Sequence, residues 1–238
     1  MMRLKINGRK CSVKKINFNG YDDIKNFYSQ AGQDLFVLQC LDGKRDGTYL
    51  ELGCNDPVRE NNTILLEQSF NWSGLSIDID PNYIDMWSVR KNPAICRDAQ
   101  ALDYSEILTH YDSVHIDYLS LDLDYPATLH CLESIPLDEI AFSVITYEHE
   151  VYSAGTSHRH QSRKILESFG YKIICSDVSN LGNAYEDWYY NPIYIDFDRI
   201  KNLESVNAEW SDILSIAHID DANNKRWIIP HSSRPKKH

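Results

Sequence analysis

Short apolar runs alternate with amphipathic stretches along most of the chain. Six mostly apolar runs predict buried strands at residues 48–54, 74–80, 94–98, 116–124, 139–148 and 171–178. The segments between them predict helices at 61–70, 83–91, 104–110, 127–134 and 157–169. Such alternation of strands and helices predicts an α/β fold of Rossmann-like build, with a mostly parallel sheet and helices on both of its faces.

The two ends of the chain are less regular. Residues 3–13 predict a hairpin around Asn7-Gly8, and SQAGQDLFVLQCL predicts a helix before the first strand. Residues 191–200 predict a last strand that could run antiparallel, and residues 231–238 predict a frayed tail. Because no internal repeat or low-complexity linker interrupts the pattern, we expect one domain over 1–238, with residues 1–28 as an extension.

Composition narrows the class of partner. The 238 residues are 42% hydrophobic and 25% charged, which suits a globular core and excludes a disordered chain. The net charge of −11 disfavours nucleic acid, because a phosphate backbone is held by cationic side chains. A neutral sugar or another small alcohol is easier to reconcile with that charge.

The sequence also bears on the compartment. No apolar run approaches the roughly 18–20 residues of a membrane helix, and the first residues lack the apolar core of a signal peptide. The 6 cysteines are scattered without a CxxC pair, which predicts buried free thiols in a reducing compartment. We therefore expect a cytoplasmic protein without a membrane span.

The loop after the first strand, in TYLELGCNDP, is the strongest local signal. Glu51, Gly53 and Asn55 would lie at the carboxyl end of that strand, where open α/β sheets bind ligands. A single glycine instead of GxGxxG argues against NAD or FAD, whose pyrophosphate needs the glycine-rich turn. One acid, one glycine and a polar loop suit a cationic ligand without phosphates, although an ordinary strand-to-loop turn explains them about as well.

Acids also end the next two strands. Asp78 closes the second strand, where an acidic residue is expected to accept both hydroxyls of a ribose. Asp80, which precedes Pro81, is predicted to cap the following helix. Asp98 closes the third strand and could accept from an adenine amine, but a solvated loop acid is nearly as good an interpretation. Acids at three successive strand ends together predict a nucleoside site.

Four segments carry a resemblance to a known family. SQAGQD (29–34), ELGCNDP (51–57), NNTILLEQSFNWSGLSIDIDP (61–81) and IDYLSLDLD (116–124) are similar to successive blocks of FkbM-type methyltransferases. The similarity extends over residues 28–150, about half of the chain. One element departs from the family pattern, since Asp124 replaces the usual Glu and Tyr125 the usual Gly.

The resemblance implies a seven-stranded class I methyltransferase fold, an S-adenosylmethionine cofactor, and O-methylation of a sugar or another small alcohol. Within that implied site, two glutamines face the cofactor, and an acid, a glycine and an asparagine line its amino-acid end. Asn61 and Thr63 close over the cofactor, and strand-end acids hold its ribose and adenine. The implied cofactor residues are Gln30, Gln33, Glu51, Gly53, Asn55, Asn61, Thr63, Asp78, Asp98, Ala99 and Asp122.

Transfer of a methyl group to an alcohol needs a base, a metal ion, or both, because an alcohol gives up its proton reluctantly. The segments LDLDYP and ITYEHEVY are expected to meet beside the methyl group. They supply the predicted catalytic residues Asp122, Asp124, Glu148 and His149. Histidine titrates near neutral pH, so His149 is the predicted general base. Asp122, Glu148 and His149 could also hold Mg²⁺ or Mn²⁺, unless the Glu-His-Glu run is only a solvated rim.

The acceptor is less constrained than the cofactor. The aromatic and acidic segment at 185–192, YEDWYYNP, could stack on a sugar, or could equally pack as a last strand. We therefore predict a glycan or small-molecule acceptor. A catalytically silent cofactor- or nucleoside-binding module is the alternative, and a NAD-linked oxidoreductase is a more distant one. The sequence leaves the acceptor's identity and the formation of a homo-oligomer open.

Overall fold

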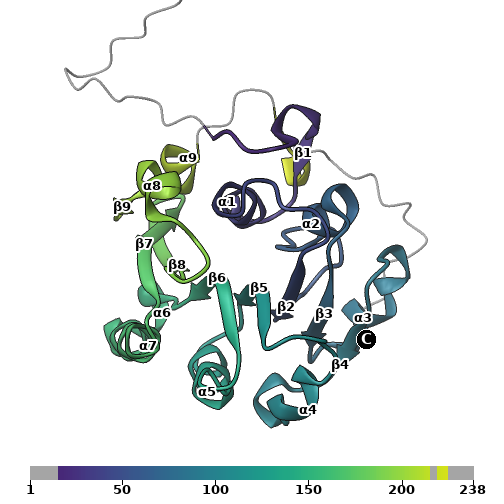
Figure 1. The fold of residues 1–238 in the computed structure, drawn as a ribbon. Helices are drawn as coiled ribbons and strands as arrows, with labels where there is room; N and C mark the ends of the chain where they lie inside the picture. The colour runs from purple at the N-terminus through teal and green to yellow at the C-terminus, as the bar shows by residue number, and fades with distance from the viewer. Residues whose placement is uncertain (1–15, 215–218, 225–238) are drawn as a thin grey trace, which may run out of the picture.

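A computed structural model describes residues 16–214 and 219–224, so the predicted hairpin at 3–13 and the predicted tail at 231–238 lie outside the described residues. An eight-stranded sheet crosses the middle of the described part (Figure 1). In spatial order its strands are β4 (Ala94–Cys96), β3 (Ser73–Asp78), β2 (Thr48–Leu52), β5 (His115–Leu121), β6 (Ala141–Glu148), β8 (Asn183–Tyr190), β7 (Lys172–Asn180) and β9 (Ser205–Val206).

Strand directions make this sheet mostly parallel. The strands from β4 to β6 all run parallel to their neighbours, whereas β8 is antiparallel to both β6 and β7. The strand order reverses between β2 and β5, which are adjacent in the sheet but separated in the chain by β3 and β4. A separate short pair joins β1 (Asn26–Phe27) to β10 (Asp220–Asp221). The Rossmann-like α/β fold predicted from the alternating pattern is confirmed.

Helices cover both faces of the sheet (Figure 1). One face carries α1 (Gln33–Cys40), α2 (Ile64–Phe70), α8 (Phe197–Ile200) and α9 (Trp210–Ile213). The other carries α4 (Tyr104–Leu108), α5 (Ala127–Ser134) and α7 (Thr156–Ser168), while α3 (Pro81–Asp85) flanks β4 and α6 (Val151–Ala154) precedes α7. Short 3₁₀ helices lie at η1 (Tyr21–Asp23), η2 (Trp87–Val89), η3 (Ala99–Ala101), η4 (Lys201–Leu203) and η5 (Ala222–Asn224).

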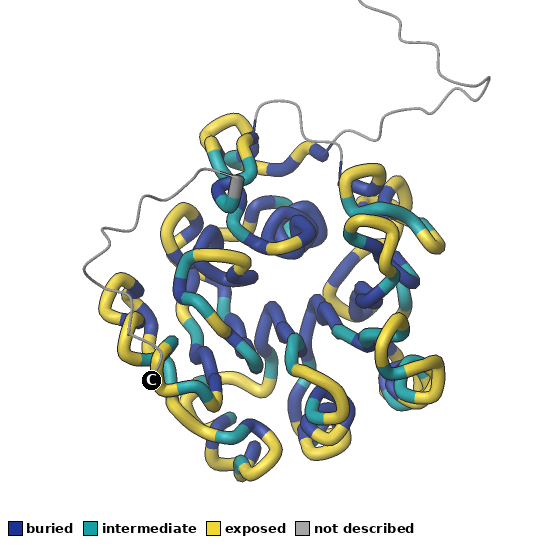
Figure 2. The backbone as a smooth tube through the Cα atoms, turned by 180° about the vertical axis from the view of Figure 1, so that it is seen from behind, coloured by how far each residue is buried: buried dark blue, intermediate teal, exposed yellow. Residues whose placement is uncertain are grey.

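The sheet separates two apolar cores because successive strand residues point to opposite faces. Tyr49 and Tyr118 pack into the core beneath α1 and α2, whereas the residues after them, Leu50 and Leu119, pack into the core beneath α4, α5 and α7. The strands are therefore buried along most of their length, and exposure is concentrated on the outer faces of the helices (Figure 2).

The last predicted strand is wrong. The antiparallel strand is β8, just before residues 191–200, and those residues form a turn followed by α8. Asn183–Tyr190 is the β-prone aromatic run, and Pro192 cannot donate a hydrogen bond to a sheet, so the strand ends before it. The aromatic residues of β8 are buried in the cores, which corrects the idea that residues 185–192 offer a platform for a sugar.

Two further observations concern the predicted compartment. Of the cysteines that the structure describes, Cys40, Cys54, Cys131 and Cys175 are buried and Cys96 is exposed, and none of them forms a disulfide. Within residues 16–214 and 219–224, no helix combines the length and the apolar character that crossing a bilayer requires.

Candidate active-site cleft

A cleft of about 510 Å³ opens at the carboxyl ends of the parallel strands. It lies where the strand order reverses between β2 and β5, the place where open α/β sheets bind their ligands. Its volume falls within the range of about 300–1,000 Å³ for small-molecule sites. The loops after β2, β3, β4 and β5 and the end of β6 all contribute to its walls.

Many of the residues predicted from the sequence meet in this cleft. Those that line it are Gln30, Gly53, Asn55, Asp78, Asp98, Ala99, Asp122, Asp124 and Glu148. Five predicted residues do not line it, and the structure places them in the interior beside or beneath it. These are Gln33, Glu51, Asn61, Thr63 and His149.

Gly53 allows the ends of β2 and β5 to approach each other closely. Its φ of 80° is a left-handed conformation, and a Cβ atom at this position would overlap the carbonyl oxygen of Asp122. The backbone N–H of Asp122 donates to the carbonyl of Leu52 at 3.1 Å, which holds the two strand ends together. A side chain at position 53 would therefore disturb the floor of the cleft as well as the turn.

Asp78 is fixed by the backbone on both sides of its carboxylate. Oδ2 accepts from the N–H of Asn55 and Oδ1 accepts from the N–H of Asp80, each at 2.8 Å. Each carboxylate oxygen keeps a further lone pair that can accept from a ligand. Asp80 itself caps α3, its Oδ1 accepting from the N–H of Asn82 at 2.9 Å, as the sequence predicted.

A buried hydrogen-bond network supports the loop between β2 and α2. Arg90 donates to Asn61 Oδ1, to Thr63 Oγ1 and to the carbonyl of Pro57, each at 3.0 Å, and pairs with Glu67. Thr63 in turn donates to Glu51 at 2.9 Å. Instead of closing over a cofactor, these predicted residues fix the loop from below. Arg90 follows η2 with no sequence motif around it, so no local signal identifies its role.

The β5–β6 end of the cleft holds a pair of carboxyl groups. Burial and the neighbouring Asp122 raise the pKa of Glu148 well above its usual range, so Glu148 is protonated at neutral pH. Burial also raises the pKa of Asp122, while hydrogen bonds from Glu148 and Asn62 oppose the rise. The Asn62 amide lies 3.0 Å from Asp122 Oδ2. The two groups therefore share one proton, with Asp122 as the carboxylate and Glu148 as the hydrogen-bond donor.

A third acid, Glu186 of β8, is paired in register with Glu148 of β6. Burial and Asp122 raise the pKa of Glu186 to about 8. Gln33, predicted to face the cofactor, instead donates to Glu186 Oε2 at 3.0 Å and to the hydroxyl of Tyr185 at 3.1 Å. Gln33 therefore anchors the buried acid behind the cleft.

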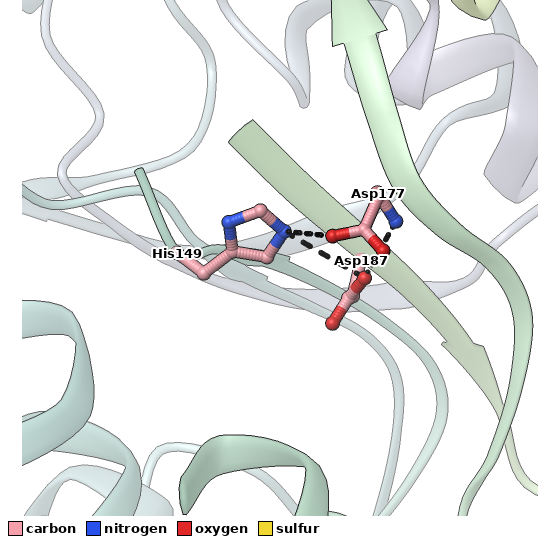
Figure 3. A group of neighbouring side chains, drawn as sticks. All are labelled: His149, Asp177 and Asp187. Atoms are coloured by element: carbon pink, nitrogen blue, oxygen red, sulfur yellow. Dashed lines mark hydrogen bonds and ion pairs between the residues drawn. The ribbon is translucent and has the colours of Figure 1, made fainter. Parts of the chain in front are cut away.

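His149, the predicted general base, points away from the cleft. Its side chain is fully buried (0% exposed), and its Nε2 lies 3.6 Å from Asp177 Oδ1 and 3.7 Å from Asp187 Oδ1 (Figure 3). Consecutive residues of an extended chain point to opposite sides, so Glu148 and His149 cannot both face the cleft. A register irregularity in β7, where Asp177 has a φ of 53°, turns the Asp177 side chain toward the imidazole.

Among the described residues, His149, Asp177 and Asp187 are the one group with metal-ligand spacing, their ligand atoms lying within 4.8 Å of one another. The chemistry of the group does not fit a cation. Arg163 binds both carboxylates, at 3.0 Å and 2.7 Å, and already neutralises part of their charge. The N–H of Val151 donates to His149 Nδ1 at 3.2 Å, which leaves the proton on Nε2, the atom that a metal would need. The predicted metal set of Asp122, Glu148 and His149 is not brought together either.

Sequence reasoning missed several residues of the cleft. Ile79 is 66% exposed there although it is large and apolar. Tyr83, Arg97, Gln100 and Leu123 also line the walls. Asp-Ile-Asp at a strand end gives no local indication that the isoleucine will stay exposed, because its position depends on where the loops after β3 and β4 lie.

Comparisons with known proteins give matches at the level of the fold. No family model and no curated protein matches the sequence. Among solved structures, the chain is similar to a TehB-like S-adenosylmethionine-dependent methyltransferase from Corynebacterium glutamicum (12% identity, TM-score 0.47, 73% of this chain and 92% of that one). It is also similar to an S-adenosylmethionine-dependent O-methyltransferase from Thermotoga maritima (10% identity, TM-score 0.48, 71% of this chain and 68% of that one). A third similar structure is a magnesium protoporphyrin IX methyltransferase from Synechocystis (15% identity, TM-score 0.45, 67% of this chain and 77% of that one). At these values the similarities carry no conclusion about function, and membership of the FkbM family stays a prediction.

Proposed function

We propose that the chain is an S-adenosylmethionine-dependent methyltransferase that methylates a hydroxyl group of a small alcohol. One observation carries this proposal. Asp78 ends β3 with both carboxylate oxygens fixed by backbone N–H groups and stands in a cleft at the point where the strand order reverses. This is the position from which an acid binds the ribose diol of a nucleoside.

The rest of the cleft fits this cofactor better than a dinucleotide. Ile79 and Ala99 provide apolar walls for an adenine ring, and Asp98 provides an acceptor for its amine. Seven acids and one arginine line the cleft, a charge that repels a pyrophosphate and favours a cationic sulfonium. Gly53 allows the close backbone approach that the amino-acid end of the cofactor needs.

The carboxyl pair at the β5–β6 end supplies the acid–base chemistry. When bound, the cofactor supplies the methyl group. Asp122 lines the cleft as a carboxylate whose pKa burial raises, so it can accept the proton of the acceptor hydroxyl. Glu148 donates its proton to Asp122 and so holds the Asp122 carboxylate in place. The base is thus assigned to Asp122 in place of His149, and no metal ligand is assigned.

Two exposed tyrosines next to Glu150, which follows β6, suit a sugar acceptor. Tyr125 and Tyr152 are 50% and 58% exposed, and both bind Glu150. The N–H of Tyr125 donates to Glu150 Oε2 at 2.8 Å and the hydroxyl of Tyr152 donates to Oε1 at 3.1 Å. Exposed aromatic faces beside carboxylates can stack on a sugar ring and accept from its hydroxyls.

Calorimetric titration with S-adenosylmethionine and with its demethylated product tests the cofactor assignment. We expect the wild type to bind both, and Asp78→Ala to weaken binding by about 1.5–3 kcal/mol, or about 10- to 150-fold, because a charge-assisted hydrogen bond to the ribose is lost. Asp85→Ala, which removes an exposed acid of α3 outside the cleft, is the matched control and should bind normally. Absence of binding by the wild type would refute the proposed function.

A further inference from the structure

Two loops from distant parts of the chain contribute to the walls of the cleft. Gln30 lies on the loop before α1 and Glu60 lies on the loop between β2 and α2, and both residues line the cleft. Neither loop belongs to a strand of the eight-stranded sheet. The hydrogen bonds between its strands therefore do not fix where Gln30 lies relative to Glu60.

Each loop is braced from within by an aspartate. In the first loop, Asp34 accepts from the N–H of Tyr28 at 2.9 Å. In the second, Asp56 accepts from the N–H of Arg59, also at 2.9 Å. Such bonds between a carboxylate and nearby backbone N–H groups order a loop locally. Because both bonds stay within one loop, neither of them fixes one loop to the other.

One side chain from the segment 219–224 joins the two loops. Asn223 Oδ1 accepts from the N–H of Glu60 at 3.0 Å. Asn223 Nδ2 donates to the carbonyls of Tyr28 and Ser29, at 2.8 Å and 3.4 Å. Because the acceptor of this amide group serves one loop and its donors serve the other, a single side chain fixes the separation of the loops.

The segment that carries Asn223 is itself anchored beside the first loop. β10 pairs in parallel with β1, and the N–H of Asp220 donates to the carbonyl of Lys25 at 2.9 Å (Figure 1). Ile219 and Ala222 are buried. Asn223 therefore has a fixed backbone from which to hold both loops.

We propose that Asn223 is a positioning residue for the cofactor, and that it acts through Gln30 and Glu60 by holding their loops at the spacing that the bound cofactor needs. This inference rests on the proposed methyltransferase function. Asn223 itself does not line the cleft. A site whose walls are fixed in advance binds more tightly, because less free energy is spent on ordering the walls. Loss of the Asn223 amide should therefore weaken cofactor binding without removing a group that touches the cofactor.

Thermodynamic linkage makes this coupling reciprocal. If Asn223 tightens cofactor binding, the bound cofactor must strengthen the Asn223 contacts by the same factor. Exchange of the Glu60 amide hydrogen reports on this bond, since Asn223 Oδ1 accepts that hydrogen. We expect the demethylated cofactor to slow this exchange in the wild type, and to slow it less in Asn223→Ala. A residue with a role in stability alone would not respond to the cofactor in this way.

Calorimetric titration of Asn223→Ala with the demethylated cofactor tests the inference, together with hydrogen-exchange mass spectrometry on peptides that overlap at Glu60. We expect the affinity to fall about fivefold or more, the size expected when neutral hydrogen bonds are lost. Asn223→Asp should weaken binding as well, because it keeps an acceptor for Glu60 but places a second oxygen against the carbonyl of Tyr28. Urea denaturation of each variant measures its stability separately from its affinity.

Asn191→Ala is the matched control. Asn191 is buried, and its Oδ1 accepts from the N–H of Ile193 at 3.0 Å. Its own N–H donates to the carbonyl of Ser143 near the start of β6, so it lies at the end of the sheet opposite the cleft. We expect Asn191→Ala to lose stability and yet to bind the demethylated cofactor as tightly as the wild type.

Three results would overturn the inference. They are wild-type affinity in Asn223→Ala, an equal loss of affinity in Asn191→Ala, and exchange of the Glu60 amide that the cofactor leaves unchanged in the wild type. Failure of the proposed function looks different, because the wild type itself would then not bind the demethylated cofactor. A wild type and an Asn223→Ala variant that bind it equally well would refute only the role of Asn223.

Discussion

Replacing Glu186 by glutamine should stabilise the protein, although Glu186 lies in its core. The pKa of this carboxyl group is raised to about 8 by burial and by the charge of Asp122. Glutamine keeps an oxygen that can accept from Trp188 and Gln33, and it places a neutral amide where Glu186 Oε1 has no partner. Only the ability to ionise is removed.

The expected size follows from proton linkage. An unfolded chain releases the Glu186 proton near pH 4.5, whereas the folded protein keeps it until about pH 8. Stability associated with this group is fully present below pH 4.5 and is lost as the pH rises toward 8, at about 1.4 kcal/mol per pH unit. At pH 7 the free energy of unfolding of Glu186→Gln should therefore exceed that of the wild type by about 3 kcal/mol, with little difference at pH 4.5.

Urea denaturation of both proteins at intervals from pH 4.5 to 8.5 measures the difference. Glu139→Gln serves as the control, because Glu139 is exposed and should show the pH profile of the wild type. Parallel profiles for the wild type and Glu186→Gln, or a variant that is less stable at every pH, would show that Glu186 is ionised in the folded protein and that the account of the acid cluster is incorrect.

Three further substitutions separate catalysis from stability. Asp122→Asn should lower turnover by about 10²–10⁴-fold while the demethylated cofactor still binds, because the proposed base is lost. Glu148→Gln replaces an acid that is already protonated at neutral pH, so its turnover should stay within about tenfold of the wild type. Transfer of a radiolabelled methyl group measures both turnover rates. Arg163→Met should destabilise the protein by about 3–5 kcal/mol in denaturant titrations, because it leaves two buried carboxylates without this cation. Burial opposes ionisation of Asp187, but Arg163 and His149 lower its pKa to about 2. The free energy of unfolding of the wild type should therefore fall as the pH drops from about 4 toward 2. This fall should be smaller in Arg163→Met, because one of the two groups that lower the pKa is absent.

The strand-end acids of the cleft could be predicted because they depend only on local pattern. A run of apolar residues predicts where a buried strand ends, and parallel strands bring their ends to one edge, so Asp78, Asp98 and Asp122 meet in the structure. The same rule of alternation could have excluded His149 once Glu148 was assigned to the cleft, since neighbours in an extended chain face opposite sides. The structure instead places His149 beside Asp177 and Asp187.

Other features of the site depend on contacts that no local pattern carries. Arg90 reaches back across 33 residues to the carbonyl of Pro57, and Gln33 reaches forward across 153 residues to Glu186. Such pairs are set by how the elements pack, and each residue in isolation looks like an ordinary polar surface position. The boundary of β8 has a related cause, because a run of aromatic residues such as 185–190 suits a ligand platform and a buried strand equally well, and only packing into the cores distinguishes the two.

The buried acids connect stability to the charge of the cleft. Burial and the neighbouring Asp122 carboxylate together raise the pKa of Glu148 and of Glu186, so both hold protons at neutral pH. The negative charge that makes Asp122 the proposed base is therefore also one of the two causes that make ionisation of Glu186 costly to the folded protein.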